Sequence, residues 1–330
     1  MNVPLSLIDF CTIHDGERPG ESIARSVRLA QEAERLGYSR IWYAEHHNMS
    51  TISSSAPAVL IAHVGAQTEK IRLGAGGVML PNHSPYVVAE QFGMLAEMYP
   101  DRIDLGLGRA PGTDQNTLGR ALRRDPRAAE HFPDDVAELA AYLSGDSLIP
   151  GVQAMPGAGT NVPLYILGSS MFGATLAAKM GLPYSFASHF APRHLTQATS
   201  YYRQNYQPSE RYPEPYVIAA VNVTAADTVD EARADFEQVA RARVRTMATR
   251  GPAGRHISEE NLDALVNSPS GQQIISMLQF TAVGDGAEVR RYLGEFTELA
   301  QADELMISLQ SPTGEKTDRA MEILAGAWEL

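Results

Sequence analysis

Short apolar runs alternate with longer amphipathic segments along this chain. Eight runs are rich in branched and aromatic side chains, as expected of strands buried on both faces; they are residues 5–10, 40–44, 71–77, 103–108, 164–167, 184–188, 216–223 and 305–308. Apolar residues recur at helical spacing in residues 22–36, 57–67, 84–99, 133–143, 171–180, 192–204, 228–249 and 315–328. Strands that alternate with helices, without a change in composition that would mark a linker, predict an α/β fold with a single (β/α)8 TIM barrel over residues 1–330.

Two segments depart from this alternation. Residues 109–133 are long, polar and rich in Arg and Asp, and we expect a functional loop. Residues 250–281 form an insertion between the seventh helix and the eighth strand, with clusters of Gly, Pro and Ser. This composition predicts short helices joined by flexible segments. The length of the insertion favours a mobile lid over an inert surface excursion.

Composition and charge narrow the class of protein. The 330 residues carry a formal net charge of −12, spread without acidic blocks, which argues against nucleic acid or an anionic membrane as partner. The single cysteine, Cys11, allows no internal disulfide and no cysteine cluster, and we expect no metal site. Residues 1–4 do not resemble a signal peptide, and no run approaches the roughly 18 apolar residues of a membrane span. We therefore expect a cytoplasmic protein.

Polar and titratable residues collect where the predicted strands end. In a barrel the carboxyl ends of all strands share one face, and that face holds the active site. The second strand is followed by Glu45, His46 and His47, the first by Phe10, and the sixth by His189. On the second strand alone, an equally simple interpretation is that Glu45 caps a loop and both histidines are solvated. The recurrence at several strand ends favours a site.

Glycine and hydroxyl residues at three other strand ends indicate a bound cofactor. The glycines of these strand ends, Gly74, Gly76, Gly77, Gly106 and Gly108, lack a Cβ atom and would let backbone lie against a flat ligand. Gly168-Ser169-Ser170 precedes a predicted helix, whose free N–H groups suit a phosphate. Arg109 could add a charge-assisted clamp on the same anion; its alternative role is a surface salt bridge. Gly106 and Gly108 do not open a helix as a dinucleotide fingerprint requires, so we find no nicotinamide-binding domain.

Three motifs, in order, carry a resemblance to a known family. They are Trp42-Tyr43-Ala44-Glu45-His46-His47, Leu73-Gly74-Ala75-Gly76-Gly77-Val78-Met79-Leu80-Pro81 and Asp101-Arg102-Ile103-Asp104-Leu105-Gly106-Leu107-Gly108-Arg109. Together with weaker matches at residues 164–170 and 283–285, they resemble the bacterial luciferase-like flavin-dependent monooxygenases, in their single-chain form that does not emit light. Luciferases carry a reactive cysteine where this chain has Gly108, which puts light emission in doubt but not monooxygenation.

The resemblance implies a (β/α)8 barrel that binds reduced FMN, supplied by a separate flavin reductase, and uses O2 through a peroxyflavin to oxygenate a small organic substrate. By position, His46 matches the catalytic histidine and Gly76-Gly77 a non-proline cis peptide beneath the flavin. Arg109, Ser169 and Ser170 match the phosphate site. Phe10, His47 and His189 are candidates for the substrate pocket.

The resemblance leaves other functions open. A reductase of the same fold that uses the deazaflavin F420 is one alternative, and a flavin-binding protein without turnover is another. A long-chain aldehyde and an aromatic polyketide remain possible substrates. The family also dimerises through the second and third helices, so we expect a homodimer; the candidate contacts are Ala58, Ala62, Gly65, Ala66, Val87, Val88, Phe92 and Met98.

Overall fold

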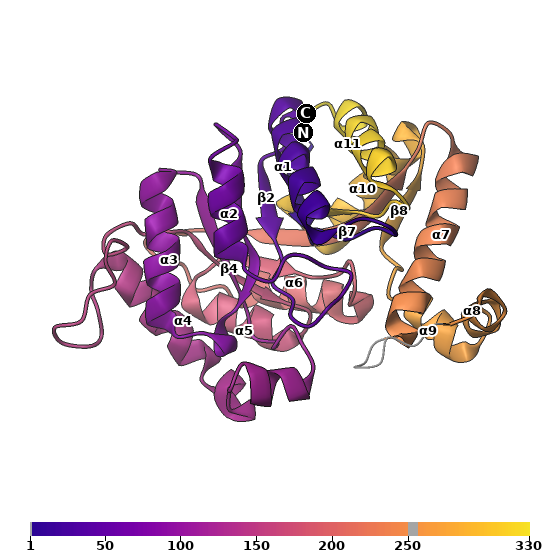
Figure 1. Ribbon diagram of the computed structural model, residues 1–330. Coiled ribbons are helices and arrows are strands. Elements are labelled where there is room, and N and C mark those ends of the chain that lie inside the picture. Colours follow the sequence, from indigo (N-terminus) through magenta and orange to yellow (C-terminus); the bar gives the residue numbers. More distant parts are fainter. Residues whose placement is uncertain (1, 250–256) are drawn as a thin grey trace.

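Eight parallel strands close into a barrel in the computed structural model, which describes residues 2–249 and 257–330 (Figure 1). Around the barrel the strands follow the order β1, β2, β3, β4, β5, β6, β7, β9, and β9 pairs with β1 to complete the circle. The strands are β1 Leu5–Asp9, β2 Arg40–Tyr43, β3 Arg72–Met79, β4 Ile103–Gly108, β5 Leu164–Gly168, β6 Tyr184–Phe186, β7 Val217–Ala225 and β9 Glu304–Leu309. The predicted (β/α)8 barrel and all eight of its strands are therefore confirmed.

Helices cover the outside of the barrel and keep its strands buried on both faces (Figure 1). They are α1 Pro19–Leu36, α2 Pro57–Gly65, α3 Pro85–Met98, α4 Phe132–Ser144, α5 Met171–Met180, α6 Leu195–Asn205, α7 Val229–Ala248, α8 Glu259–Val266, α9 Pro269–Ser276, α10 Gly286–Ala300 and α11 Gly314–Trp328. Their ends follow local chemistry. Gly37 ends α1 with a left-handed φ of 92°, and the Thr228 hydroxyl accepts from the Glu231 amide at 3.2 Å to begin α7.

The sequence prediction missed two elements, one strand and one helix, that directly precede β9 in the chain. A ninth strand, β8 (Thr281–Gly284), pairs only with the second half of β7, and α10 follows it. Four residues are too few to show a strand period. The helix was readable, because Asp285 caps its first turn and Val289, Leu293, Phe296 and Ala300 are buried at helical spacing. The predicted short helices of the insertion are α8 and α9, whereas residues 250–256 lie outside the described part of the chain.

Trp42 fills the middle of the barrel and accounts for several glycines. A Cβ atom at Gly74 would lie 2.6 Å from Trp42 Nε1, and one at Gly76 would lie 2.9 Å from Trp42 Cβ. These glycines are therefore required by a buried aromatic ring, which packs edge-on against Tyr165 at 5.0 Å between ring centroids. The sequence interpretation, in which these side chains are absent to admit a ligand, is wrong for Gly74 and incomplete for Gly76.

A charged network closes the opposite, amino-terminal end of the barrel. Arg40 donates to Asp104 at 2.7 Å and to Glu304 at 3.0 Å, and Arg72 pairs with Asp104 at 2.5 Å. Arg40, Asp104 and Glu304 are buried, and two cations facing two carboxylates satisfy one another. The residues at this end are thus mutually paired, which leaves the carboxyl end for chemistry.

Candidate active site

Glu45 joins the carboxyl ends of β2 and β3. It is 1% exposed, and its Oε1 accepts from His47 Nε2 at 2.8 Å and from His83 Nε2 at 2.7 Å, while its Oε2 accepts from the Met79 amide at 3.0 Å. Burial alone would raise the pKa of Glu45, but the hydrogen bonds from His47, His83 and Met79, with the charge of His83, bring the pKa down to about 2. Glu45 is therefore an ionised anchor between two strand ends.

These contacts also position two neighbouring histidines. Glu45 orients His47, because the Nε2 atom of His47 lies within hydrogen-bond distance of this carboxylate. Its backbone N–H also donates to Gly112 O at 3.1 Å. His47 therefore connects the loop after β2 to the loop after β4. His83 was missed by the sequence analysis. Its place directly after the third strand and Pro81-Asn82 was the signal that could have found it.

Phe10, His46 and His189 come together from three different strand ends. The Phe10 ring lies 5.8 Å from the His46 ring and 6.0 Å from the His189 ring, between centroids. The His46 backbone is fixed by its N–H, which donates to Ser54 O at 3.0 Å. Three aromatic side chains that lie up to 179 residues apart along the chain thus form one wall, in which Phe10 and His46 are half-buried and His189 is buried.

His189 is held neutral within this wall. It is 5% exposed, and its carbonyl accepts from Asn222 Nδ2 at 2.7 Å. Burial, the nearby cation of Arg243 and the His46 ring lower the pKa of His189 to about 3. Its imidazole is consequently uncharged at working pH.

Arg109 and the start of α5 form a second group of site residues. The Arg109 guanidinium carbon lies 3.9 Å from the centroid of the Phe172 ring, and Phe172 is in the first turn of α5. The N-cap residue, Ser170, makes no side-chain hydrogen bond to that turn. No acidic side chain in residues 2–249 or 257–330 pairs with Arg109, so the alternative of a surface salt bridge is not what this structure has. Arg109, Ser169 and Ser170 lie at adjacent strand ends, as the sequence suggested.

The Gly76–Gly77 peptide bond is cis, as the family resemblance implies. It lies in β3, where the pairing with β4 shifts between Gly76 and Val78. A Cβ atom at Gly77 would lie 2.6 Å from Gly106 O. The two strands therefore approach closely at the carboxyl end of the barrel, beside Met79 and the Glu45 anchor.

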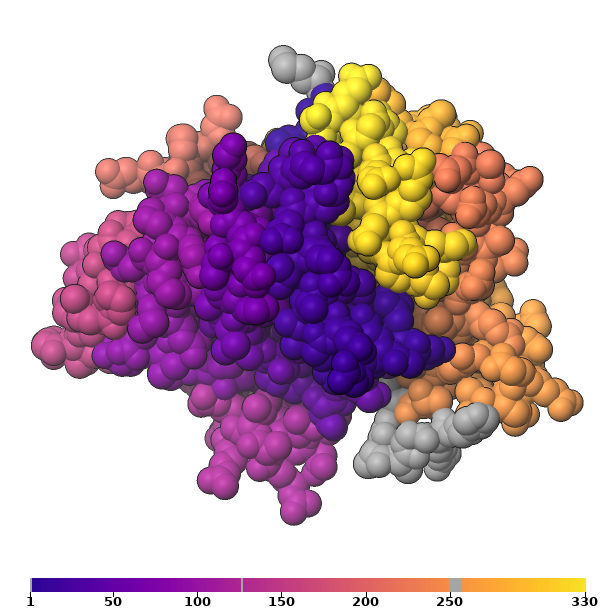
Figure 2. All heavy atoms as spheres, turned by 45° about the horizontal axis from the view of Figure 1, so that its top comes forward, coloured from indigo at the N-terminus to yellow at the C-terminus, as the bar shows by residue number. Residues whose placement is uncertain are grey.

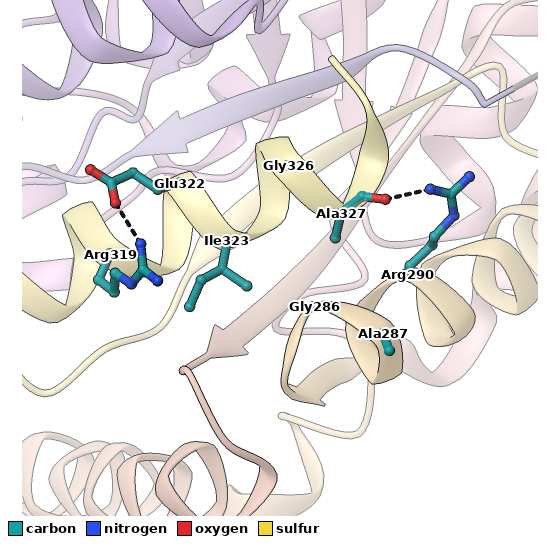
Figure 3. A pocket seen from close by; sticks show the side chains of 8 residues that line it. All are labelled: Gly286, Ala287, Arg290, Arg319, Glu322, Ile323, Gly326 and Ala327. Carbon is teal, nitrogen blue, oxygen red and sulfur yellow. Dashed lines mark hydrogen bonds and ion pairs between the residues drawn. The ribbon is translucent and has the colours of Figure 1, made fainter.

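Two hollows elsewhere do not belong to this site. One lies between α10 and α11, where Arg319 pairs with Glu322 and Arg290 donates to Ala327 O (Figure 3). The other lies beside α4 and the amino end of β5.

Within the described ranges, no group of three or more His, Cys, Asp or Glu residues is placed to hold a metal ion. None of the helices seen there has the length and apolar character to cross a membrane.

At its carboxyl face the closed (β/α)8 barrel carries the wall of Phe10, His46 and His189, a cis diglycine, and Arg109, which has no acidic partner in the described part of the chain. Barrels of this class hold their active sites at the carboxyl ends of their strands. The sequence profile described as luciferase-like monooxygenase matches residues 6–302, and the chain belongs to this family. A luciferase-like monooxygenase of Escherichia coli K12 is 43% identical over 309 residues, which is 93% of this chain and 92% of the relative. An N-acetyl-S-alkylcysteine monooxygenase of Bacillus subtilis is 38% identical over 56% of this chain and 57% of its own.

Solved structures agree on the fold. The crystal structure of apo-MsnO8 superposes with a TM-score of 0.88 at 32% identity, over 99% of both chains. The oxygenating constituent of 3,6-diketocamphane monooxygenase, in complex with FMN, gives 0.70 at 14% identity, and an F420-dependent secondary alcohol dehydrogenase gives 0.70 at 15%. These two cover 98% and 99% of both chains. At such identities they show the shared barrel alone.

Proposed function

We propose that this protein is a flavin-dependent monooxygenase that uses reduced FMN and O2 to oxygenate a small organic substrate. Membership of the luciferase-like monooxygenase family supports the reaction class. The observation that carries the choice of FMN is the Arg109 cation, which has no acidic partner among the described residues and stacks on Phe172, at a helix start without a side-chain cap. A guanidinium and free helix N–H groups are the donors that a terminal phosphate requires.

The residues at the carboxyl face fit this cofactor. Arg109, Ser169, Ser170 and the first amides of α5 would hold the phosphate, and Gly76-Gly77 would present backbone without side chains to the ring system. Reduced FMN, when bound, supplies the electrons that activate O2. The Phe10 and His189 rings then form the substrate wall, and the neutral state of His189 keeps that wall free of fixed charge.

His46 is the residue we assign to proton transfer. It ends β2 within the aromatic wall, and a histidine can give or take a proton near pH 7. Glu45 does not serve this role, because its carboxylate is occupied by three donors and stays ionised. The charge of Glu45 instead fixes His47 and His83 as supports for the loop that carries His46.

We propose three accessory features with this activity. The lack of a nicotinamide motif assigns flavin reduction to a separate reductase, which a cytoplasmic setting would supply. Helices α8 and α9 would form a lid that excludes water. A homodimer would form through α2 and α3, where Val59 is 70% and Met94 52% exposed. Of the contacts expected from sequence, Gly65, Val88 and Phe92 are buried within the subunit.

Isotopically labelled O2 provides the test. The protein is incubated with FMN, NADH, a flavin reductase and one substrate at a time: an N-acetyl-S-alkylcysteine, a long-chain aldehyde or an aromatic polyketide. Incorporation of one labelled oxygen atom into a product supports monooxygenation. Reduction of oxidised F420 by an alcohol, or oxidation of reduced F420 by an enone, without label in any product, would transfer the assignment to the F420 alternative. Flavin binding without either reaction would support the third alternative, a flavin-binding protein without turnover.

A further inference from the structure

Residues 109–131, here called the basic segment, reverse the charge of the rest of the chain. The basic segment carries five arginines against three acidic residues, whereas the whole chain has a net charge of −12. It begins at Arg109, directly after β4, and includes the short helices η2 (Thr117–Ala121) and η3 (Pro126–Glu130). It therefore places local positive charge at the carboxyl face of an acidic protein.

One of the three acids in the basic segment is ion-paired with an arginine, since Asp125 pairs with Arg127 at 3.1 Å. Asp114 accepts from the neutral Thr117 and Asn48 at 2.6 and 3.1 Å and keeps its charge, so the five arginines and three acids leave the segment a net charge of +2 (5 − 3). Within the described part of the chain, no acidic side chain pairs with the exposed Arg120 and Arg123, or with Arg109. Three arginines of the basic segment thus keep their charge unneutralised. By contrast, the two arginines of the hollow between α10 and α11 are both paired, Arg319 with Asp227 and Arg290 with Glu329.

Both ends of the basic segment meet at the same ring. Arg109 stacks on Phe172 at 3.9 Å, and Phe132, just beyond the other end, lies 6.5 Å from Phe172 between ring centroids. The segment is also fastened to the ends of β2 and β3. Asn82 Nδ2 donates to Pro111 O, and Arg124 Nε donates to Asn82 O, each at 2.8 Å. In Figure 2 the magenta lobe at the bottom of the molecule is this segment, projecting into solvent.

We propose that Arg120 and Arg123 draw the phosphate of reduced FMN toward Arg109 and the start of α5. This inference rests on the proposed function and adds a kinetic role to residues that touch neither cofactor nor substrate. A phosphate monoester carries close to two negative charges at neutral pH, and a protein of net charge −12 repels it at long range. Exposed cations in the segment that begins at Arg109 reverse that field locally and raise the rate of encounter, over a distance of about 8 Å at physiological salt.

The test measures association rates by anaerobic stopped-flow fluorescence with reduced FMN and with reduced riboflavin. The variant is Arg120→Gln with Arg123→Gln, which keeps both side chains polar. The control is Arg28→Gln with Arg211→Gln, which removes the same charge from two exposed arginines outside the basic segment. Circular dichroism verifies that all three proteins are folded. Each rate is measured from 20 mM to 500 mM salt.

We expect the association rate of FMN to fall roughly three- to tenfold in the Arg120/Arg123 variant at low salt. This effect is smaller than the roughly 10- to 1,000-fold rate enhancement by a complete charged cleft, because only two charges are changed. The difference should vanish at high salt, the dissociation rate should be unchanged, and riboflavin and the control should show neither effect. Equal rates for the variant and the unaltered protein would overturn the proposal, as would an equal loss for riboflavin. Failure of the unaltered protein to bind FMN would instead remove the proposed function, and this inference with it.

Discussion

Replacement of Glu45 by Gln tests whether the anchor between β2 and β3 stabilises the carboxyl face through its charge. The folded protein lowers the pKa of Glu45 from an ordinary 4.5 to about 2. At 1.36 kcal/mol per pH unit, this corresponds to about 3 kcal/mol of folding free energy above pH 5. Because the folded pKa is the lower one, that stability is present above the unfolded pKa and is lost as the pH falls toward 2. Near pH 3 about 1.4 kcal/mol should remain.

The measurement is urea unfolding followed by the fluorescence of Trp42 and Trp328, at pH 7, 5 and 3. Glu45→Gln should lower the free energy of unfolding by about 3 kcal/mol at pH 7, and the gap to the parent should narrow in acid. Glu210→Gln, an exposed glutamate without an ion pair in the described residues, is the matched control and should change little. A loss below about 1 kcal/mol at pH 7, or a gap that does not narrow in acid, would refute the reasoning.

Four further predictions concern the proposed activity. Arg109→Ala should weaken FMN binding about ten- to a hundredfold in fluorescence titration while riboflavin binding changes little; equal weakening of both would show that Arg109 does not read the phosphate. His46→Ala should bind FMN normally, but its turnover rate should fall on the order of 10²–10⁴-fold and should lose a pH dependence that the parent shows. If His47→Ala alone were inactive while folded, proton transfer would be assigned to His47. Met94→Glu with Val59→Glu should give a monomer in light scattering, and a parent that is already monomeric at micromolar concentration contradicts the dimer. Removal of α8 and α9 should raise the hydrogen peroxide released per NADH oxidised, whereas unchanged coupling would rule out a lid.

The barrel was predictable because its strands are buried on both faces and its helices are amphipathic. Composition identifies continuous apolar runs such as residues 216–223 as strands. Periodicity and a capping residue identify segments such as α7 as helices. β8 could not be found in this way. Its four residues are strand only because the long β7 offers them a partner, which is a tertiary effect that no local pattern records.

The proximity of three candidate site residues was predictable from the sequence, but the hydrogen-bond partners of Glu45 were not. The rule that barrel strand ends share one face brought Phe10, His46 and His189 together correctly. The partners of Glu45 were not foreseeable, since His83 lies 38 positions away and approaches only after β3 is in place. Likewise Gly74 looked like space for a ligand, and only the packed structure shows that the Trp42 ring fills it.

The pairing of β8 with β7 also bears on how this protein could be engineered. Asn222 lies opposite Thr281 at the start of that pairing, and the same asparagine holds the carbonyl of His189. β8, where the insertion ends, therefore pairs with the residue that fixes the carbonyl of His189 in the aromatic wall. An exchange of chain segments between relatives should keep β7, β8 and the residue at position 189 as one inherited unit. Chimeras joined before residue 189 or after β8 preserve this unit, whereas a single junction between β7 and β8 divides it.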